Sequence, residues 1–419
     1  MHQIYRKTDM RKLIIQLLLF FSIGFSGDQP YVLMVSFDGF RYDYTEMAHT
    51  PNFDRLAADG VKAEALIPVF PTLTFPNHYS IATGAYAGTH NITGNSFYDK
   101  QYHEKYSLYD KETVRDAKFY KSEPIWVTAE RQEVKSASYF WVGTEAPVKG
   151  YSPSIFKYYD GSVSFHARVD SIISWLKLPE EIRPQLTMLY FSEPDQTGHN
   201  VGVHKPEIIK SIEEMDELLG YLLNELETLK IYPDLNIVVV SDHGMIDVSE
   251  DRLVILDDYI SRLGDLYING RGTHVQFDLK KGEEKYKNTL LTELKEIPNC
   301  RIWKKDEIPV RFHFNNGNTG EYLLLADEGW FITTKTEMEE HDFTLGGMHG
   351  YDPQLPNMHG IFYAMGPDLK SGLQIPAFEN IHIYPLICEL LDIIPYSGMN
   401  DTPEGDIRVL QDILKEQRD

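Results

Sequence analysis

Residues 235–245, LNIVVVSDHGM, join a continuous apolar run to an aspartate and a histidine. Two other segments repeat this arrangement. Tyr31–Phe37 (YVLMVSF) leads into Asp38, and Leu186–Phe191 (LTMLYF) leads into a short polar stretch that ends at Asp195. Continuous apolar runs of this length are typical of strands buried on both faces, as in a parallel sheet. We therefore predict three buried strands, each followed by an acidic residue.

The chain between the second and third runs predicts an amphipathic helix that begins near Pro206. Its apolar residues recur at spacings of three and four. They are Ile208, Ile212, Met215, Leu219, Leu222 and Leu226. A strand, a helix and a further strand in this order indicate a right-handed crossover. The expected fold class is α/β, with a doubly wound, mostly parallel sheet flanked by helices.

The acidic residues after the three strands are expected at one edge of this sheet. In doubly wound sheets the ligand site lies beyond the carboxyl ends of the strands. Asp38, Asp195 and Asp242 all fall there. An aspartate at a strand end is also common as a turn or helix cap. Position alone therefore makes these residues candidates without assigning them a role.

The pattern changes between residues 250 and 345, where an α+β insertion subdomain is predicted. Its strand-like runs are His274–Leu279, Cys300–Trp303 and Tyr322–Ala326, and its helix-like run is Tyr286–Ile297. The main sheet resumes with a strand-like run at Gly360–Met365. We predict a main domain made of residues 27–249 and 346–419, interrupted by the insertion.

Aspartates and histidines recur together in a way that suits zinc, which takes nitrogen and oxygen ligands. The candidates are Asp38, Asp195, His199, Asp242, His243 and His349. The four-residue spacing of Asp195 and His199 would let a loop fold both side chains onto one ion. Most of the 15 histidines must be ordinary surface or structural residues. His359, which also precedes a glycine, is a weaker alternative to His349.

Residues 70–78, FPTLTFPNH, contain a candidate nucleophile, Thr74, ahead of a helix-like stretch at Tyr79–Ala82. Proline is favoured in the first helical turn, so Pro76 puts Thr74 near a helix N-terminus. That end of a helix favours phosphate. Zinc at the hydroxyl would lower its pKa, as it does for water. The alternative is that Thr74 only caps the helix.

Four blocks carry a family resemblance. They are FPTLTFPNHYSIATGAYAGTHNITGNSFYD at 70–99, SEPDQTGHNVG at 192–202, VVVSDHGM at 238–245 and GGMHGYD at 346–352. Over about residues 30–410 the chain resembles the nucleotide pyrophosphatase/phosphodiesterase family of the alkaline phosphatase superfamily, in a bacterial-type form with the catalytic domain alone.

The resemblance implies two zinc ions per chain and a covalent intermediate. The ligands it implies are Asp195, His199 and His349 for one ion, and Asp38, Thr74, Asp242 and His243 for the other. It implies that Thr74 is transiently nucleotidylated and then released by water. It also implies that the Asn95 amide donates a hydrogen bond to a phosphate oxygen.

The resemblance further places four side chains around a nucleotide base. They are Phe75, Leu108, Tyr159 and Tyr190. Stacking on one aromatic ring contributes about 1–3 kcal/mol and tolerates any base. The alternative is that these side chains belong to the core, since a chain with 26 tyrosines is rich in aromatics throughout. Leu73 departs from the pattern, because many relatives have lysine beside the nucleophile.

Composition limits the partners. The 419 residues carry 40 basic and 63 acidic side chains, a net charge of −23. This balance argues against binding long nucleic acid through the general surface. Two cysteines, Cys300 and Cys388, are too few for a disulfide scaffold. Cys388 lies in an apolar run and is predicted to be a buried thiol.

Residues 1–26 are predicted to be a signal peptide. Arg11 and Lys12 precede the apolar stretch Leu13–Phe25, and cleavage is expected near Ser26. The apolar stretch is short for a membrane span, although an anchored N-terminus is the alternative. The predicted product is exported, to the periplasm or beyond the cell, without stable membrane insertion.

The predicted function is hydrolysis of nucleotide phosphodiester and pyrophosphate bonds, with release of nucleoside 5′-monophosphates. A second hypothesis keeps the metals and changes the substrate, to phosphocholine- or lysophospholipid-type esters or to phosphate monoesters. A third is an exported, metal-dependent nucleotide-binding protein without turnover. The pattern indicates no oligomeric state.

Overall fold

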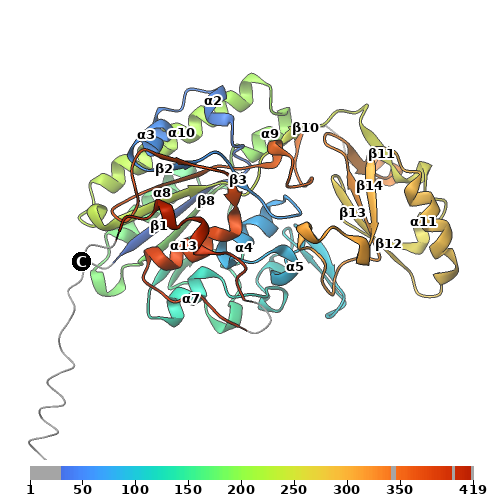
Figure 1. Ribbon diagram of the computed structural model, residues 1–419, viewed down its shortest axis with the longest axis horizontal. Helices are drawn as coiled ribbons and strands as arrows, with labels where there is room; N and C mark the ends of the chain where they lie inside the picture. The colour runs from blue at the N-terminus through green and yellow to red at the C-terminus, as the bar shows by residue number, and fades with distance from the viewer. Residues whose placement is uncertain (1–29, 341–345, 399–401, 417–419) are drawn as a thin grey trace, which may run out of the picture.

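The computed structural model describes residues 30–340, 346–398 and 402–416 (Figure 1). The predicted signal peptide, 1–26, lies outside these ranges. The larger part is built on an eight-stranded sheet. In spatial order its strands are β19 (Leu373–Ile375), β2 (Val61–Ala63), β18 (Phe362–Met365), β9 (Leu235–Val240), β1 (Tyr31–Phe37), β8 (Leu186–Phe191), β6 (Ser136–Tyr139) and β7 (Ile155–Lys157).

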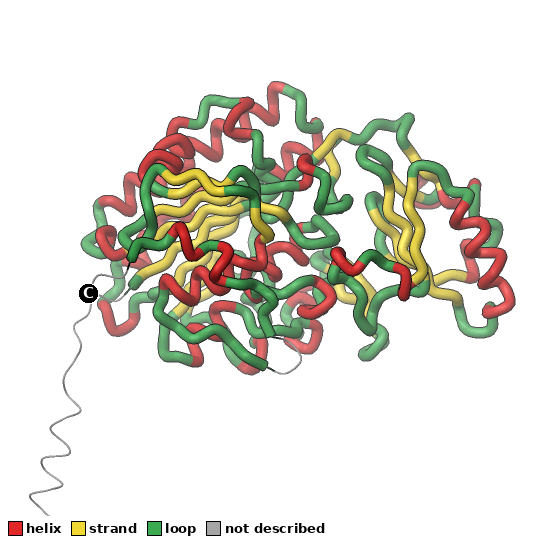
Figure 2. The backbone as a smooth tube through the Cα atoms, in the orientation of Figure 1, coloured by secondary structure: helices red, strands yellow, loops and turns green. Residues whose placement is uncertain are grey.

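β18 runs antiparallel to both of its neighbours, and the other strands share one direction. The three strands predicted from the apolar runs are β1, β8 and β9, with the expected bounds, and they lie side by side at the centre. Figure 2 shows helices on both faces of this sheet. The doubly wound, mostly parallel α/β fold is therefore confirmed.

Alternate residues of β1 pack into two separate cores on opposite faces of the sheet. Leu33 and Val35 belong to one core, and Val32 and Met34 belong to the other. Every residue of β1 is buried. Burial on both faces explains why this run is continuously apolar rather than alternating.

Helices from different parts of the chain cover each face (Figure 1). One face carries α3 (Pro51–Asp59), α8 (Phe165–Leu176) and α10 (Pro206–Glu227), and the other carries α4 (Thr74–Thr83), α7 (Ile125–Arg131) and α13 (Ile383–Leu390). The helix predicted after Pro206 is α10, and its predicted apolar stripe is buried. Cys388 of α13 is a buried free thiol, as expected, and Cys300 is a half-buried one. In the part of the chain described here, no helix has both the length and the apolar character to cross a membrane.

A second, four-stranded antiparallel sheet lies to one side of the main sheet (Figure 2, right). Its strands, in spatial order, are β12 (Leu266–Asn269), β13 (His274–Leu279), β15 (Tyr322–Ala326) and β14 (Cys300–Lys304), and α11 (Lys287–Lys295) packs on it. The predicted runs of the insertion correspond to β13, β14, β15 and α11. The core of this part also contains Tyr351 and Met358, so the boundaries 250 and 345 stay a prediction.

A short ladder brings the chain back from the insertion. β10 (Ile246–Asp247), which follows β9 closely, pairs antiparallel with β17 (Gly347–Met348). His349 comes directly after β17. This pairing therefore returns the chain to the carboxyl edge of the main sheet.

Candidate active site

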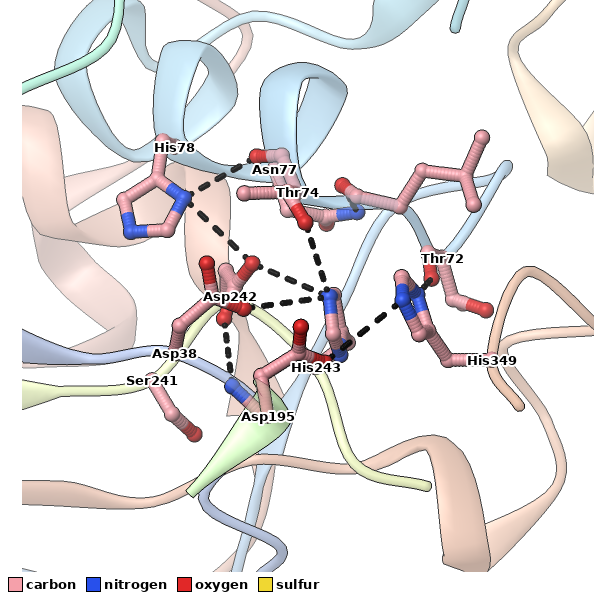
Figure 3. Close-up of polar contacts among 12 residues, drawn as sticks. Asp38, Thr72, Thr74, Asn77, His78, Asp195, Ser241, Asp242, His243 and His349 are labelled. Carbon is pink, nitrogen blue, oxygen red and sulfur yellow. Dashed lines mark hydrogen bonds and ion pairs between the residues drawn. The ribbon is translucent and has the colours of Figure 1, made fainter. Parts of the chain in front are cut away.

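Three predicted ligands gather where β1 and β9 end (Figure 3). The His243 Nε2 atom lies 3.1 Å from Asp242 Oδ2 and 3.5 Å from Asp38 Oδ1. It also lies 3.3 Å from the Thr74 hydroxyl oxygen. The side chains of Asp242 and His243 have no exposed surface, and that of Asp38 is 2% exposed. We call Asp38, Asp242 and His243 the inner group.

Thr74 is the first residue of α4 and turns its hydroxyl toward the inner group. Leu73 occupies the capping position, and no side chain caps this helix. The capping alternative for Thr74 is therefore wrong. The Phe75 N–H, in the first turn, donates to Asn95 Oδ1 at 2.9 Å. That bond occupies the amide oxygen of Asn95 and leaves its NH₂ as the group available to a ligand.

Three further predicted ligands form a second set, which we call the outer group: Asp195, His199 and His349. His199 Nε2 lies 3.4 Å from Asp195 Oδ2 and 3.1 Å from His349 Nε2. The His199 side chain is 35% exposed, against 13% for Asp195 and 4% for His349. The His243 and His349 rings stack with centroids 3.5 Å apart, so the two groups adjoin.

The expected loop between Asp195 and His199 is wrong in detail. These residues belong to a helix, α9 (Asp195–Val201). A four-residue spacing places both side chains on one helical face. The helix therefore brings Asp195 and His199 together, as the loop was expected to do. Gly198 lies within this turn because a Cβ there would meet the Met245 sulfur at 2.3 Å.

The three clustered histidines share one hydrogen-bonding arrangement. Each Nδ1 is within bonding distance of a backbone carbonyl: that of Gly347 for His199 (2.9 Å), Gly244 for His243 (3.0 Å) and Thr72 for His349 (2.9 Å). A proton on Nδ1 leaves the Nε2 lone pair free. This arrangement is typical of metal-ligating histidines.

The clustered carboxylates present oxygens that lack partners. Asp38 Oδ1, Asp195 Oδ1 and Asp242 Oδ2 are buried and have no hydrogen-bond partner among the described residues. Buried acceptors that have no hydrogen-bond partner and carry negative charge need a cation to compensate them. The chemistry of this donor set, carboxylate oxygen with imidazole nitrogen, fits zinc.

The electrostatics of the cluster agree with that conclusion. Burial, and next the charges of Asp242 and Asp195, raise the pKa of Asp38 well above its ordinary value. Burial alone would raise the pKa of Asp242 too, but the neighbouring rings of His243 and His78 lower it. Burial and the two nearby imidazoles lower the pKa of His349, which keeps it neutral and able to bind a metal.

The four side chains predicted around a base line one cavity of about 510 Å³ that opens beside Thr74. We call it the base cavity. Tyr159 is 43% exposed and packs its ring against Phe140, with centroids 5.0 Å apart. Phe75 and Leu108 are half-buried in the wall. Tyr190 has an added contact, because its hydroxyl donates to Asp38 Oδ2 at 2.6 Å.

Comparison with known proteins identifies the family. Residues 32–352 match the family described as type I phosphodiesterase / nucleotide pyrophosphatase. The chain belongs to this family. It is 37% identical over 375 residues to human ectonucleotide pyrophosphatase/phosphodiesterase family member 5, covering 88% of this chain and 76% of that protein. It is 35% identical over 376 residues to a venom phosphodiesterase of Naja atra, again over 88% of this chain but only 45% of the relative's length.

Solved structures of family member 5 share the fold. The murine protein, in an inactive threonine-to-alanine form in complex with AMP, superimposes with a TM-score of 0.85 at 34% identity, over 92% of this chain and 100% of that one. The human protein gives a TM-score of 0.86 at 35% identity, with the same coverage. This member of the phosphodiesterase family therefore has the fold of family member 5.

One residue of the centre was missed by sequence reasoning. His78 is fully buried, and its Nδ1 lies 3.0 Å from the Thr74 carbonyl and 3.3 Å from Asp242 Oδ2. Its Nε2 lies 2.8 Å from Ser36 Oγ. Both ring nitrogens of His78 therefore have hydrogen-bond partners, the Thr74 carbonyl and the Ser36 hydroxyl, so we interpret His78 as a positioning residue rather than a ligand. The available signal was its spacing of four from Thr74 on α4.

His359, the weaker alternative ligand, belongs to neither group. Its Nε2 bonds the Pro353 carbonyl at 2.9 Å. Its ring is in edge-to-face contact with Tyr42. His359 is therefore a structural histidine next to the site.

A second cavity of about 470 Å³, not anticipated from the sequence, adjoins the base cavity. The residues that line both are Asn95, Leu108, Tyr109, His199 and His349. Leu73 and Arg271 line only the second one. We call it the distal cavity. It extends from the outer group toward the insertion.

Proposed function

We propose that this chain is a two-zinc phosphodiesterase and pyrophosphatase that cleaves nucleotide esters through a covalent intermediate on Thr74. Membership of the family supports hydrolysis of phosphodiesters and pyrophosphates. The observation that carries the proposal is a hydroxyl 3.3 Å from His243 Nε2, among buried carboxylate oxygens without partners, at the mouth of an aromatic-lined cavity.

The inner and outer groups would each hold one zinc ion, with Thr74 beside the inner group. When bound, the two ions supply the positive charge that favours the alkoxide and offsets charge on the leaving oxygen. Nucleophilic attack, hydrogen bonding to the phosphate and binding of the nucleoside are carried out by residues of the chain. Zinc is favoured because the six donors combine nitrogen and oxygen.

The reaction has two displacements at phosphorus. First the Thr74 oxygen, having lost its proton to solvent, bonds to phosphorus. The bond from phosphorus to the leaving oxygen breaks, and the leaving group keeps that oxygen. Water then attacks phosphorus and breaks the bond to Thr74, which releases the nucleoside 5′-monophosphate and restores the hydroxyl. The Asn95 amide donates to a non-bridging oxygen, and the N-terminus of α4 favours its negative charge.

The base cavity binds the nucleoside part of the substrate. The AMP complex of the murine relative supports a nucleoside monophosphate as the group held there. Stacking on Phe75 and Tyr159 would tolerate any base. The names of the relatives, an ectonucleotide pyrophosphatase/phosphodiesterase and a venom phosphodiesterase, support export of this chain.

Thr74→Ala tests the proposal. We expect the rate of hydrolysis of p-nitrophenyl TMP to fall by roughly 10³-fold or more, with an unchanged circular dichroism spectrum and retained binding of AMP. Thr74→Ser, which keeps a hydroxyl, is the matched control and should retain measurable turnover. Activity of the alanine variant within tenfold of wild type would remove Thr74 as nucleophile. Faster hydrolysis of p-nitrophenyl phosphate or p-nitrophenyl phosphorylcholine by wild type would assign a different substrate class.

A further inference from the structure

We propose that the distal cavity binds a leaving group that carries its own phosphate, and that Arg271 pairs with that phosphate. This inference rests on the proposed function and narrows it. The favoured substrates are then pyrophosphate-linked nucleotides, such as dinucleotides and nucleoside triphosphates. Esters of uncharged alcohols would be poorer substrates.

The arrangement of the two cavities separates the two halves of such a substrate. Thr74 and Asp38 line the base cavity alone, whereas His199 and His349 line both cavities. In phosphoryl transfer the attacking and leaving oxygens lie roughly in line across phosphorus. With the nucleoside in the base cavity, the group leaving past His199 and His349 has the distal cavity as its space.

The charge of the distal cavity is opposite to that of the chain. None of its described lining residues is acidic, although the chain has 63 acidic residues. The base cavity, by contrast, has a mixed lining of three acidic and two basic residues, which are Asp38, Glu145, Asp195, Lys111 and Arg115. Arg271 is the permanent cation among the described residues that line the distal cavity. A lone arginine with no carboxylate nearby in its wall suits a phosphate.

The backbone around Arg271 holds it in place while its side chain stays unpaired. Gly270 and Gly272 flank it with φ values of +92° and +80°, a conformation that favours glycine. Gly272 exchanges backbone hydrogen bonds with Ile332 in both directions. The Arg271 side chain is exposed, and within the described ranges its guanidinium makes no hydrogen bond or ion pair.

The uncharged side chain of Leu73 gives a reason for the positive charge at Arg271. It lies beside the nucleophile, at the place where the resemblance implies lysine, and it lines the distal cavity. The positive charge missing at Leu73 is present instead at Arg271, contributed by the insertion. Leu73 therefore leaves one wall of the distal cavity uncharged, and Arg271 provides a positive charge on another wall.

The remaining wall suits the rest of a nucleotide leaving group. Phe331 and Met348 provide apolar surface in the distal cavity. Tyr109, which is 83% exposed, lies at the rim shared with the base cavity. An exposed aromatic rim beside an arginine is suited to a base or sugar attached to the phosphate.

The test compares leaving groups on the full, zinc-loaded chain. We expect Arg271→Ala to lower kcat/KM for ATP and for diadenosine diphosphate by about tenfold or more, because a charge-assisted contact is lost. For p-nitrophenyl TMP, whose leaving group has no phosphate, kcat/KM should stay within twofold. Arg271→Lys should retain part of the effect, since it keeps the charge without the planar fork. Lys281→Ala removes an exposed charge from the insertion outside both cavities and is the matched control.

Equal losses on all three substrates, or no loss on any, would overturn the assignment of Arg271. If wild type hydrolyses none of them, the proposed function fails, and the subsite is tested separately. Calorimetry of inorganic pyrophosphate with the Thr74→Ala protein should then give at least threefold weaker binding when Arg271→Ala is added, but not when Lys281→Ala is added. Equal binding in both double variants would overturn the subsite as well.

Discussion

The inner and outer groups contain the same donor types in different surroundings. The inner group lies at the ends of two adjacent central strands and is shielded from solvent. The outer group is assembled from α9 and the segment after β17, and His199 is partly exposed. Shielding raises the cost of unpaired charge and slows exchange with solvent. Under the proposal that each group holds one metal ion, the inner group should depend more on its ion, and the outer group should release its ion more readily.

The strongest test of this difference is Asp38→Asn. We expect at least roughly a 100-fold loss of activity, because a predicted ligand to the metal beside Thr74 is neutralised. We also expect the metal-free protein to become more stable by ~1 kcal/mol. The pKa of Asp38 is raised in the fold, so an ionised Asp38 costs stability above pH 3.8, and a neutral amide removes that cost at neutral pH.

Denaturant unfolding with and without zinc measures both parts of this prediction. Asp195→Asn, in the more open group, is the comparison variant and should stabilise the metal-free chain less. A metal-free Asp38→Asn protein less stable than wild type would show that repulsion in the inner group is not a significant cost.

A smaller effect is expected at His78, which supports the inner group only. His78→Gln removes the Nδ1 donor to the Thr74 carbonyl and should lower kcat roughly tenfold. His78→Asn places an amide near the former Nδ1 and should restore most of kcat. Steady-state kinetics with p-nitrophenyl TMP measures both, and His359→Gln, near the site but outside both groups, should leave kcat unchanged. Equal losses in the Asn and Gln variants would indicate that His78 acts only through packing.

The smallest effect on activity is expected from a substitution at Tyr159, which belongs to neither the inner nor the outer group. Tyr159→Leu removes a half-exposed ring from the base cavity and should raise KM by about fivefold, which corresponds to ~1 kcal/mol of stacking. The kcat should not change, because both ligand groups remain. Tyr159→Phe keeps the ring and is the control. A fall in kcat with constant KM would place Tyr159 in the chemical step instead of in binding.

Sequence reasoning gave the correct positions where the local pattern of the chain is sufficient to define them. A buried strand and the aspartate after it are adjacent in the chain, so Asp38 and Asp242 could be placed from the apolar runs alone. The direction of β18 could not be predicted, because four apolar residues carry no information about direction. The helix α9 was missed because its seven residues include Asp195, Gly198 and His199 and have no apolar stripe.

The rest of the site depends on contacts between distant segments. His78 is on the buried face of α4, where a histidine cannot be told from a packing residue without its partner Asp242. The distal cavity is lined from segments near Leu73, Arg271 and His349, and no spacing in the sequence relates them. The position of Arg271 follows from the way the insertion folds back on the main sheet.

The ladder of β10 and β17 has a consequence for the maturation of the protein. The chain leaves the sheet after His243, forms the whole insertion, and returns only at His349. The inner group can be assembled from the main sheet alone. The outer group also needs His349, which follows the whole insertion in the chain, so its assembly includes the entropic cost of closing that long loop. A chain with an unfolded insertion would keep the inner group and lose the outer group. Zinc stoichiometry, more than the shape of the central sheet, would then report whether the entire polypeptide has matured.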